Sequence, residues 1–173
     1  MGGMDAEDFR QIRDAVRDLV REQVVPLEEQ IEDDDRIPDE LRATAAEMGL
    51  FGYALPEEHG GLGVDMREDV QLAFEFGYTT PAFRSLFGTN NGIAGQVIAK
   101  FGDEEQKKKY LPRLAAGELI GSFALTEAEA GSDPAGLRTS ARPATSSVCM
   151  SAISACTSWN RPIGAPPCFA VAA

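Results

Sequence analysis

The sequence has few cations, a single histidine and no apolar run long enough to cross a bilayer. Lysine and arginine together number 16 against 28 acidic residues, which gives a formal net charge of -12. No basic stripe is available to neutralise phosphates, so nucleic-acid binding is excluded, and binding to an anionic membrane surface is disfavoured. The first twenty residues alternate charged and apolar side chains without a hydrophobic block, so we expect no secretory signal.

Cysteine is also scarce, and its placement argues against both disulfides and metal sites. The three cysteines are Cys149, Cys156 and Cys168, an odd number without C-x-x-C spacing. We therefore expect free thiols in a reducing cytoplasm and no bound metal. His59 has no neighbouring serine, cysteine or second metal ligand, so we interpret it as an exposed loop residue.

What the sequence does contain is helical periodicity, which predicts a mainly α fold with an antiparallel helical domain over residues 1–117. Apolar residues recur at three- and four-residue steps from Phe9 to Ile31, with Pro26 expected to interrupt the helix. A second helix is expected between Pro38 and Gly49, and Asp103 with Gln106 predicts a capped later helix. The helix predicted over residues 66–78 is expected to bury Val70, Ala73, Phe74 and Gly77.

The chemically informative stretch is residues 123–136, F-A-L-T-E-A-E-A-G-S-D-P-A-G. It begins as an apolar strand and turns polar at Thr126 and Glu127, which places hydroxyls and free backbone N–H groups at one edge of a fold. Such groups suit a polar heterocycle or a phosphate. The alternative is a plain turn in which Asp133 caps a short helix that starts at Pro134.

Three segments together resemble the acyl-CoA dehydrogenase family. Residues 124–136 match the family signature at every restricted position, while residues 55–63 (L-P-E-E-H-G-G-L-G) and 101–112 (F-G-D-E-E-Q-K-K-K-Y-L-P) resemble two further family segments. The resemblance covers residues 5–141. It implies an FAD enzyme that introduces an α,β double bond into an acyl-CoA thioester and passes the hydride to flavin N5. It also implies an electron-transfer flavoprotein as partner and a homo-oligomeric parent.

The resemblance also implies the site residues. Those implied to contact the cofactor are Phe123, Ala124, Leu125, Thr126, Glu127, Gly131 and Ser132. Substrate contacts are expected from Ser132, Thr89 and Ile93. The small residues around Gly92 and Gly95 leave two alternatives open, close helix packing or space for an acyl chain.

No catalytic residue is identified in the sequence. Glu127 is rejected as a base, because the family's catalytic glutamate lies in a C-terminal helical domain that this chain lacks. The resemblance thus predicts a dehydrogenase fragment that is inactive alone. The alternatives are a non-catalytic helical interaction module and a fragment of a related acyl-CoA oxidase or flavin monooxygenase.

The remaining residues divide into the start of a middle β domain (118–141), with the flavin-contacting loop, and a tail (142–173). No acidic residue and no lysine occurs after Asp133, and Pro162, Pro166 and Pro167 punctuate the tail. We expect the tail to be irregular and unrelated to the family. Reverse translation on the complementary strand permits family-like strings, so we hypothesise that it is an antisense reading of an inverted piece of such a gene.

Overall fold

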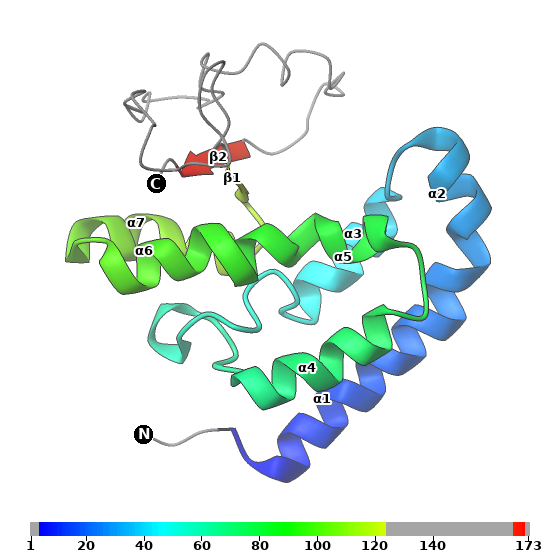
Figure 1. Ribbon diagram of the computed structural model, residues 1–173, viewed down its shortest axis with the longest axis horizontal. Helices are drawn as coiled ribbons and strands as arrows, with labels where there is room; N and C mark the ends of the chain where they lie inside the picture. The colour runs from blue at the N-terminus through cyan, green and yellow to red at the C-terminus, as the bar shows by residue number, and fades with distance from the viewer. Residues whose placement is uncertain (1–3, 124–167, 172–173) are drawn as a thin grey trace, which may run out of the picture.

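The structure is a computed structural model that describes residues 4–123 and 168–171. These residues form an array of helices followed by two short strands (Figure 1). The elements in chain order are α1 (Ala6–Asp18), η1 (Leu19–Val24), η2 (Val25–Leu27), α2 (Glu28–Asp34), α3 (Asp39–Glu47), η3 (Glu57–His59), α4 (Met66–Phe76), α5 (Pro81–Thr89), η4 (Asn90–Ala94), α6 (Gly95–Phe101), α7 (Glu104–Ala115), β1 (Ile120–Phe123) and β2 (Cys168–Val171).

The first helical rod runs from α1 to α2 and changes its winding on the way. Its middle is the π-helical η1, and Pro26 lies in the single 3₁₀ turn η2 that follows. Proline has no N–H to donate to the preceding turn, so the α-helical ladder gives way there. The interruption predicted at Pro26 is confirmed. Residues Val16, Leu19 and Val20 are buried on the inner side of the rod, in keeping with their spacing.

α4 lies beside α1 (Figure 1), and it buries a face different from the predicted one. Leu72, Glu75 and Phe76 are its buried residues. The prediction that Val70, Phe74 and Gly77 are buried was wrong, since all three are exposed, and Ala73 is only partly buried. The reason is that Phe76 joins a group of aromatic rings, which turns the opposite apolar side of α4 outward.

The aromatic group forms the centre of the main core. Phe87 contacts every other member, with ring centroids separated by 5.2 to 6.3 Å. Most of these pairs meet edge to face, an arrangement that adds about 0.5–1.5 kcal/mol per pair beyond the buried area. The rings belong to the loop after α3, to α4 and to α5, so their packing fixes these three segments to one another. The members are Phe51, Tyr53, Phe76, Phe83 and Phe87.

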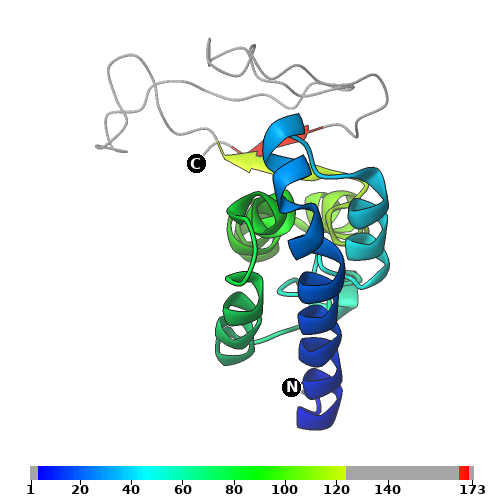
Figure 2. The ribbon, with the colours of Figure 1, turned by 90° about the vertical axis from the view of Figure 1, so that its right-hand side faces the viewer.

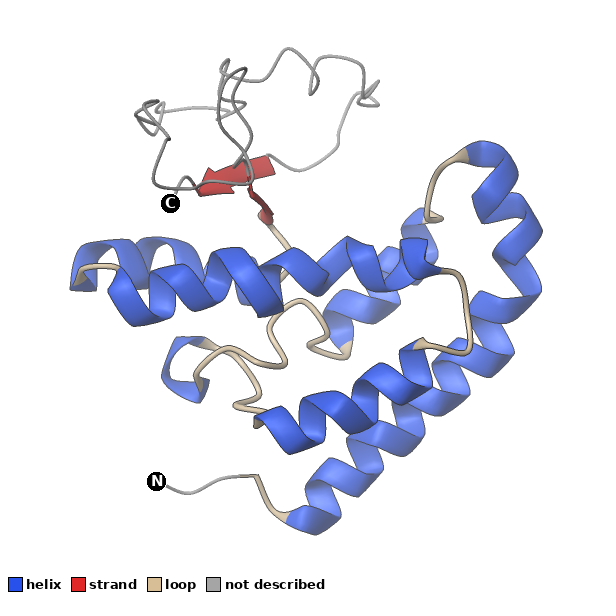
Figure 3. Ribbon diagram, in the orientation of Figure 1, coloured by secondary structure: helices blue, strands red, loops and turns tan. Residues whose placement is uncertain are grey.

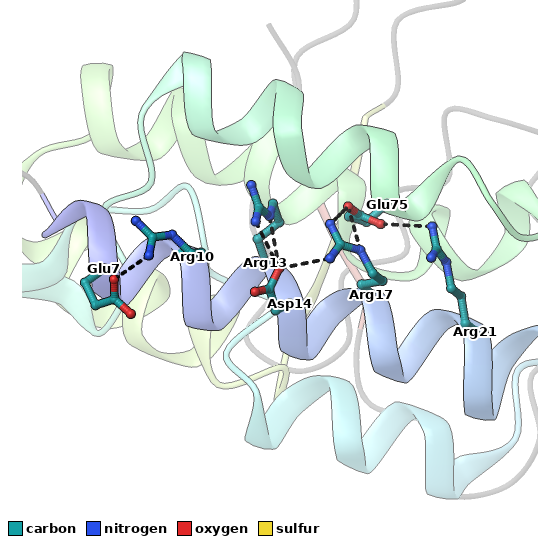
Figure 4. Close-up of polar contacts among 7 residues, drawn as sticks. All are labelled: Glu7, Arg10, Arg13, Asp14, Arg17, Arg21 and Glu75. Atoms are coloured by element: carbon teal, nitrogen blue, oxygen red, sulfur yellow. Dashed lines mark hydrogen bonds and ion pairs between the residues drawn. The ribbon is translucent and has the colours of Figure 1, made fainter.

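Charged side chains join α1 to α4 at the edge of this core (Figure 4). The guanidinium group of Arg17 donates two hydrogen bonds to Oε1 of Glu75, at 3.2 and 2.7 Å. Arg21 lies on the other side of the same carboxylate, 3.7 Å from Oε2. The two arginines therefore compensate the charge of a carboxylate that the helix packing removes from water.

α5, η4 and α6 form a second continuous rod (Figure 1). The chain stays helical through Gly88 and Gly92, the two glycines of the G-T-N-N-G segment at residues 88–92. The π-helical turn η4 makes this possible, because the N–H of Gly95 donates to the carbonyl of Asn90 rather than of Asn91. The rod packs beside α7, whose N-terminus carries the predicted capping box of Asp103 and Gln106.

Pro112 lies inside α7 rather than at its end. α7 continues through this exposed residue to Ala115, and the turn follows at Gly117 with φ of +72°. Pro112 removes one helix hydrogen bond, and the tertiary packing of Leu111 and Leu114 in a second apolar cluster outweighs this loss.

The chain then enters β1, which pairs in parallel with β2 on one side of the helical body (Figures 2 and 3). The register sets Ile120 opposite Cys168 and Phe123 opposite Val171. β2 lies in the tail that was expected to be irregular. Its sequence, C-F-A-V, consists of small and strand-favouring residues, and it follows directly after Pro166 and Pro167. The fold is mainly helical with a small β element, as the sequence predicted.

Candidate functional site at the junction of helix and strand

The centre of the candidate site is the contact between η4 and β1, and Asn90 makes it. The side-chain amide of Asn90 is fully buried and donates to the carbonyls of Leu114 and Leu119, at 3.0 and 2.9 Å. Its carbonyl oxygen accepts the N–H of Gly121 at 2.6 Å. One side chain thus joins the second helical rod, the end of α7 and the first residues of the strand.

The neighbouring Asn91 is equally buried, but it is directed into the helical body. It donates to the carbonyls of Leu50 and Phe87, at 2.8 and 3.0 Å, and accepts the N–H of Ala54 at 2.9 Å. The amide of Gln96 adds a bond to the carbonyl of Ala54. These contacts hold the loop after α3 against the rod.

The glycine-rich turn at Gly92 and Gly95 has different surroundings on its two sides. A Cβ placed on Gly95 would lie 2.5 Å from Leu55 Cδ2, so this side is closely packed. A Cβ on Gly92 would meet nothing within 4 Å, and the neighbouring Ile93 is 41% exposed. The Gly92 side is therefore open and exposed, while the Gly95 side is closely packed against Leu55.

Of the predicted substrate residues, Thr89 and Ile93 lie within the described part of the chain. They stand one helical turn apart on the rod, at the end of α5 and within η4. Thr89 is partly buried, and its Cγ2 would lie 3.7 Å from a Cβ on Gly121. The structure thus brings Thr89 to the start of β1, and Ile93 to the surface nearby. Their contact with a substrate stays a prediction.

The predicted cofactor residues begin where the description of the structure ends. Phe123 is the last residue of β1. Ala124, Leu125, Thr126, Glu127, Gly131 and Ser132 lie outside the described residues, and so do the alternative turn at Asp133 and most of the tail. Their roles stay predictions. The described part shows that the strand leading to them begins at a fixed point on the helical body.

Asn90 and Asn91 were missed as functional candidates by the sequence reasoning. The available signal was two adjacent amides inside a helical stretch, away from either end. Asparagine is a poor helix former because its amide competes for backbone hydrogen bonds. Two of them in the middle of a rod indicate that the amides have partners elsewhere in the fold.

His59 was predicted to be exposed, and this prediction was wrong. Its side chain is only 12% exposed and lies 3.6 Å from Glu58 Oε1, in the 3₁₀ turn η3. The turn packs against α7. Within residues 4–123 and 168–171 no group of three or more histidine, cysteine or acidic residues is arranged to hold a metal ion. In the same residues no helix is long and apolar enough to span a membrane.

Comparison with known proteins identifies the family of this helical body. Residues 6–118 match the family model described as acyl-CoA dehydrogenase, N-terminal domain. An acyl-CoA dehydrogenase of Bacillus subtilis (strain 168) is 37% identical over 130 residues, which are 75% of this chain and 34% of that protein. The chain belongs to the acyl-CoA dehydrogenase family. It spans about a third of the length of this curated relative.

Solved structures show the same relationship in three dimensions. Glutaryl-CoA dehydrogenase from Mycobacterium smegmatis superimposes with a TM-score of 0.68 at 36% identity, covering 79% of this chain and 35% of the other. An acyl-CoA dehydrogenase from Bacillus anthracis, solved with FAD, gives a TM-score of 0.66 at 37% identity, with coverages of 77% and 23%. The helical fold of this chain is therefore a fold found in members of the family.

Proposed function

We propose that this chain provides the N-terminal helical domain of an FAD-dependent acyl-CoA dehydrogenase. The observation that supports this proposal is continuity along the chain. The residues that match the family's domain end at 118, and β1 begins at Ile120. The residues that resemble the flavin-contacting loop then follow Phe123 directly.

In this proposal the rod and the strand contribute to different parts of one site. The exposed side of η4, with Ile93 and the space beside Gly92, forms part of the wall for the acyl chain, and Thr89 lies beside it. Beyond β1, Leu125 and Thr126 present backbone groups and a hydroxyl to the edge of the flavin, and Ser132 contacts both ligands. FAD, when bound, accepts the hydride from the β carbon of the acyl chain.

We further propose that the chain does not catalyse the reaction by itself. A base must come within hydrogen-bond reach of the α proton. The family resemblance places that base in a C-terminal domain, and the chain covers about a third of its relative's length. An electron-transfer flavoprotein as acceptor, a homo-oligomeric parent and a cytoplasmic location are parts of the same proposal.

The test is flavin binding followed by reduction. The purified chain is mixed with FAD, separated from free FAD by gel filtration, and its visible absorbance recorded before and after an acyl-CoA is added. We expect a yellow protein that does not bleach. Bleaching by acyl-CoA would contradict the proposed inactivity, and a colourless protein would contradict FAD binding by the chain alone.

A second candidate function is a non-catalytic helical module that pairs with another subunit. The observation that favours it is a row of exposed apolar side chains on and just after α4, spaced four residues apart. Large exposed apolar surfaces on a folded domain are typical of interaction sites. The four side chains of this row, named here the α4 stripe, are Met66, Val70, Phe74 and Tyr78.

A further inference from the structure

We propose that Asn90 is a positioning residue that fixes the start of β1 to the turn carrying Thr89 and Ile93. Through this bond it sets where the flavin-contacting loop begins relative to the acyl wall. The inference rests on the proposed function for the roles of the loop and the wall. The positioning of the strand by Asn90 rests on contacts of the described residues alone.

The first argument is that every hydrogen-bonding group of the Asn90 side-chain amide has a backbone partner. A primary amide has two N–H donors and one carbonyl acceptor. Both donors reach backbone carbonyls that flank the turn from α7 into the strand, at Leu114 and Leu119, and the acceptor takes the N–H of Gly121. Because the group is fully buried, water cannot replace any of these bonds, and their loss leaves buried polar groups unpaired.

The second argument is the close approach of the backbones at this point. A Cβ on Gly121 would lie 2.5 Å from the Cβ of Ala94 and 3.3 Å from Oδ1 of Asn90. Only glycine at 121 lets the strand lie directly on η4, with no side chain between them. The strand start is thus fixed in position by packing as well as by hydrogen bonding, so a small change at either residue displaces it.

The third argument is that the amide emerges from a π-helical turn. Asn90 and Asn91 both lie in this turn, and their side chains bond different segments, Asn90 to β1 and Asn91 to the loop after α3. π-Helical turns are rare and occur frequently at functional sites. Here the turn carries both the proposed wall residue Ile93 and the bond that holds the strand.

Asn91 offers a matched control. It is buried to the same degree as Asn90 and makes the same number of side-chain hydrogen bonds, and these bonds join it to Leu50, Ala54 and Phe87 rather than to β1. Asn90→Ala and Asn91→Ala therefore lose the same chemical group from adjacent positions. A general loss of stability affects both variants, whereas a loss of strand positioning affects Asn90→Ala alone.

The experiment compares both variants of the full chain at a temperature where circular dichroism shows each to be folded. Amide hydrogen exchange at Gly121 and fluorescence titration with FAD are the two readouts. We expect Asn90→Ala to speed exchange at Gly121 at least about tenfold, which corresponds to loss of roughly one hydrogen bond. We expect its Kd for FAD to rise by a factor of about ten, and both quantities to stay within about threefold of wild type in Asn91→Ala.

A second pair of variants serves if Asn90→Ala does not fold. Gly121→Ala places a methyl group against Ala94 and is expected to raise the Kd for FAD and the exchange at neighbouring strand amides. Adding Ala94→Gly removes the opposing methyl group and is expected to restore both. Equal effects of Asn90→Ala and Asn91→Ala, or no restoration by Ala94→Gly, would overturn the inference. If wild type binds no FAD but Gly121 exchange responds to Asn90→Ala only, FAD binding by the chain fails and the positioning role stands.

Discussion

A single oxygen of Glu75 on α4, Oε1, accepts two hydrogen bonds from Arg17 on α1, at 3.2 and 2.7 Å (Figure 4). The glutamate side chain is only 10% exposed. Its second oxygen, Oε2, is buried without a hydrogen-bond partner and has Arg21 at 3.7 Å. The relationship is therefore asymmetric, because the carboxylate is sheltered while its cationic partners reach it from the solvent side.

This asymmetry predicts that removing one partner is worse than removing both. Arg17→Met is expected to lower the free energy of unfolding, because it removes both hydrogen bonds to a sheltered carboxylate and leaves Arg21, 3.7 Å from Oε2, as its counter-ion. The double variant Arg17→Met, Glu75→Met removes the carboxylate as well and is expected to lose less than Arg17→Met alone. Urea denaturation at neutral pH measures both.

The control for this prediction is Arg10, whose ion pair with Glu7 is exposed on both sides. Arg10→Met is expected to lose at most about 1 kcal/mol, the range of surface ion pairs. If Arg17→Met behaves like Arg10→Met, or if the double variant loses as much stability as Arg17→Met, the Glu75 carboxylate does not depend on Arg17.

A second prediction concerns Tyr53, whose hydroxyl donates to Asp69 Oδ1 at 2.8 Å inside the main core. Tyr53→Phe removes a hydrogen bond to a charged acceptor and is expected to cost about 1–3 kcal/mol of unfolding free energy. Tyr78→Phe, at an exposed position, makes the same chemical change and serves as the control. Thermal and urea unfolding at neutral pH compare them.

The same residue predicts a pH dependence. Burial, and then the bond to Asp69, raise the pKa of Tyr53 above its ordinary value of 10.0. The unfolded chain therefore releases this proton at a lower pH than the folded one, so stability falls as pH rises above about 10. Tyr53→Phe has no proton to release, so its stability should decline less steeply there. Equal alkaline slopes for wild type and variant would contradict this.

Local features of the fold were predictable from sequence. The interruption at Pro26 and the cap formed by Asp103 and Gln106 depend on residues within a few positions of each other. Pro26 lacks an N–H, and Asp103 and Gln106 lie three residues apart, so both effects are the same wherever the helix lies in the fold. These predictions hold because no distant segment is involved.

Features set by distant segments were not predictable. α4 has apolar residues on two sides, and its own sequence does not say which side faces the core. Phe76 rather than Phe74 is buried, because its ring packs against those of Tyr53 and Phe87, which lie on other segments of the chain. Asn90 likewise takes its partners from residues 24 to 31 positions away. The residues that the family resemblance implies to contact the flavin lie outside the described part of the chain, except Phe123.

A third prediction follows from the first turn of α7. Nζ of Lys107 donates to Oε1 of Glu104 at 3.1 Å, and this bond lowers the pKa of Glu104 below its ordinary value of 4.5. A lowered pKa means that the ionised carboxylate stabilises the fold above pH 4.5, and that this contribution is lost as pH falls through the folded-state pKa. Glu104→Gln should therefore be less stable than wild type at neutral pH.

The difference between Glu104→Gln and wild type should shrink on acidification and vanish once Glu104 is protonated in both states. Glu105→Gln is the control, because it lies in the same turn and removes the same charge beside the helix N-terminus. Urea unfolding measured in steps from neutral to acidic pH gives both profiles. A difference that persists in acid would show that packing rather than charge explains the loss.

The last prediction tests whether the α4 stripe pairs two copies of this chain. Val70 and Phe74 are 50% and 70% exposed, so Val70→Ser, Phe74→Ser should change the free energy of unfolding by no more than about 1 kcal/mol. If the chain pairs with a second copy through this stripe, analytical ultracentrifugation should show a dimer for wild type and a monomer for the double variant. Phe101→Ser, exposed on α6, should remain dimeric. A monomeric wild type would exclude the pairing of two copies through this stripe.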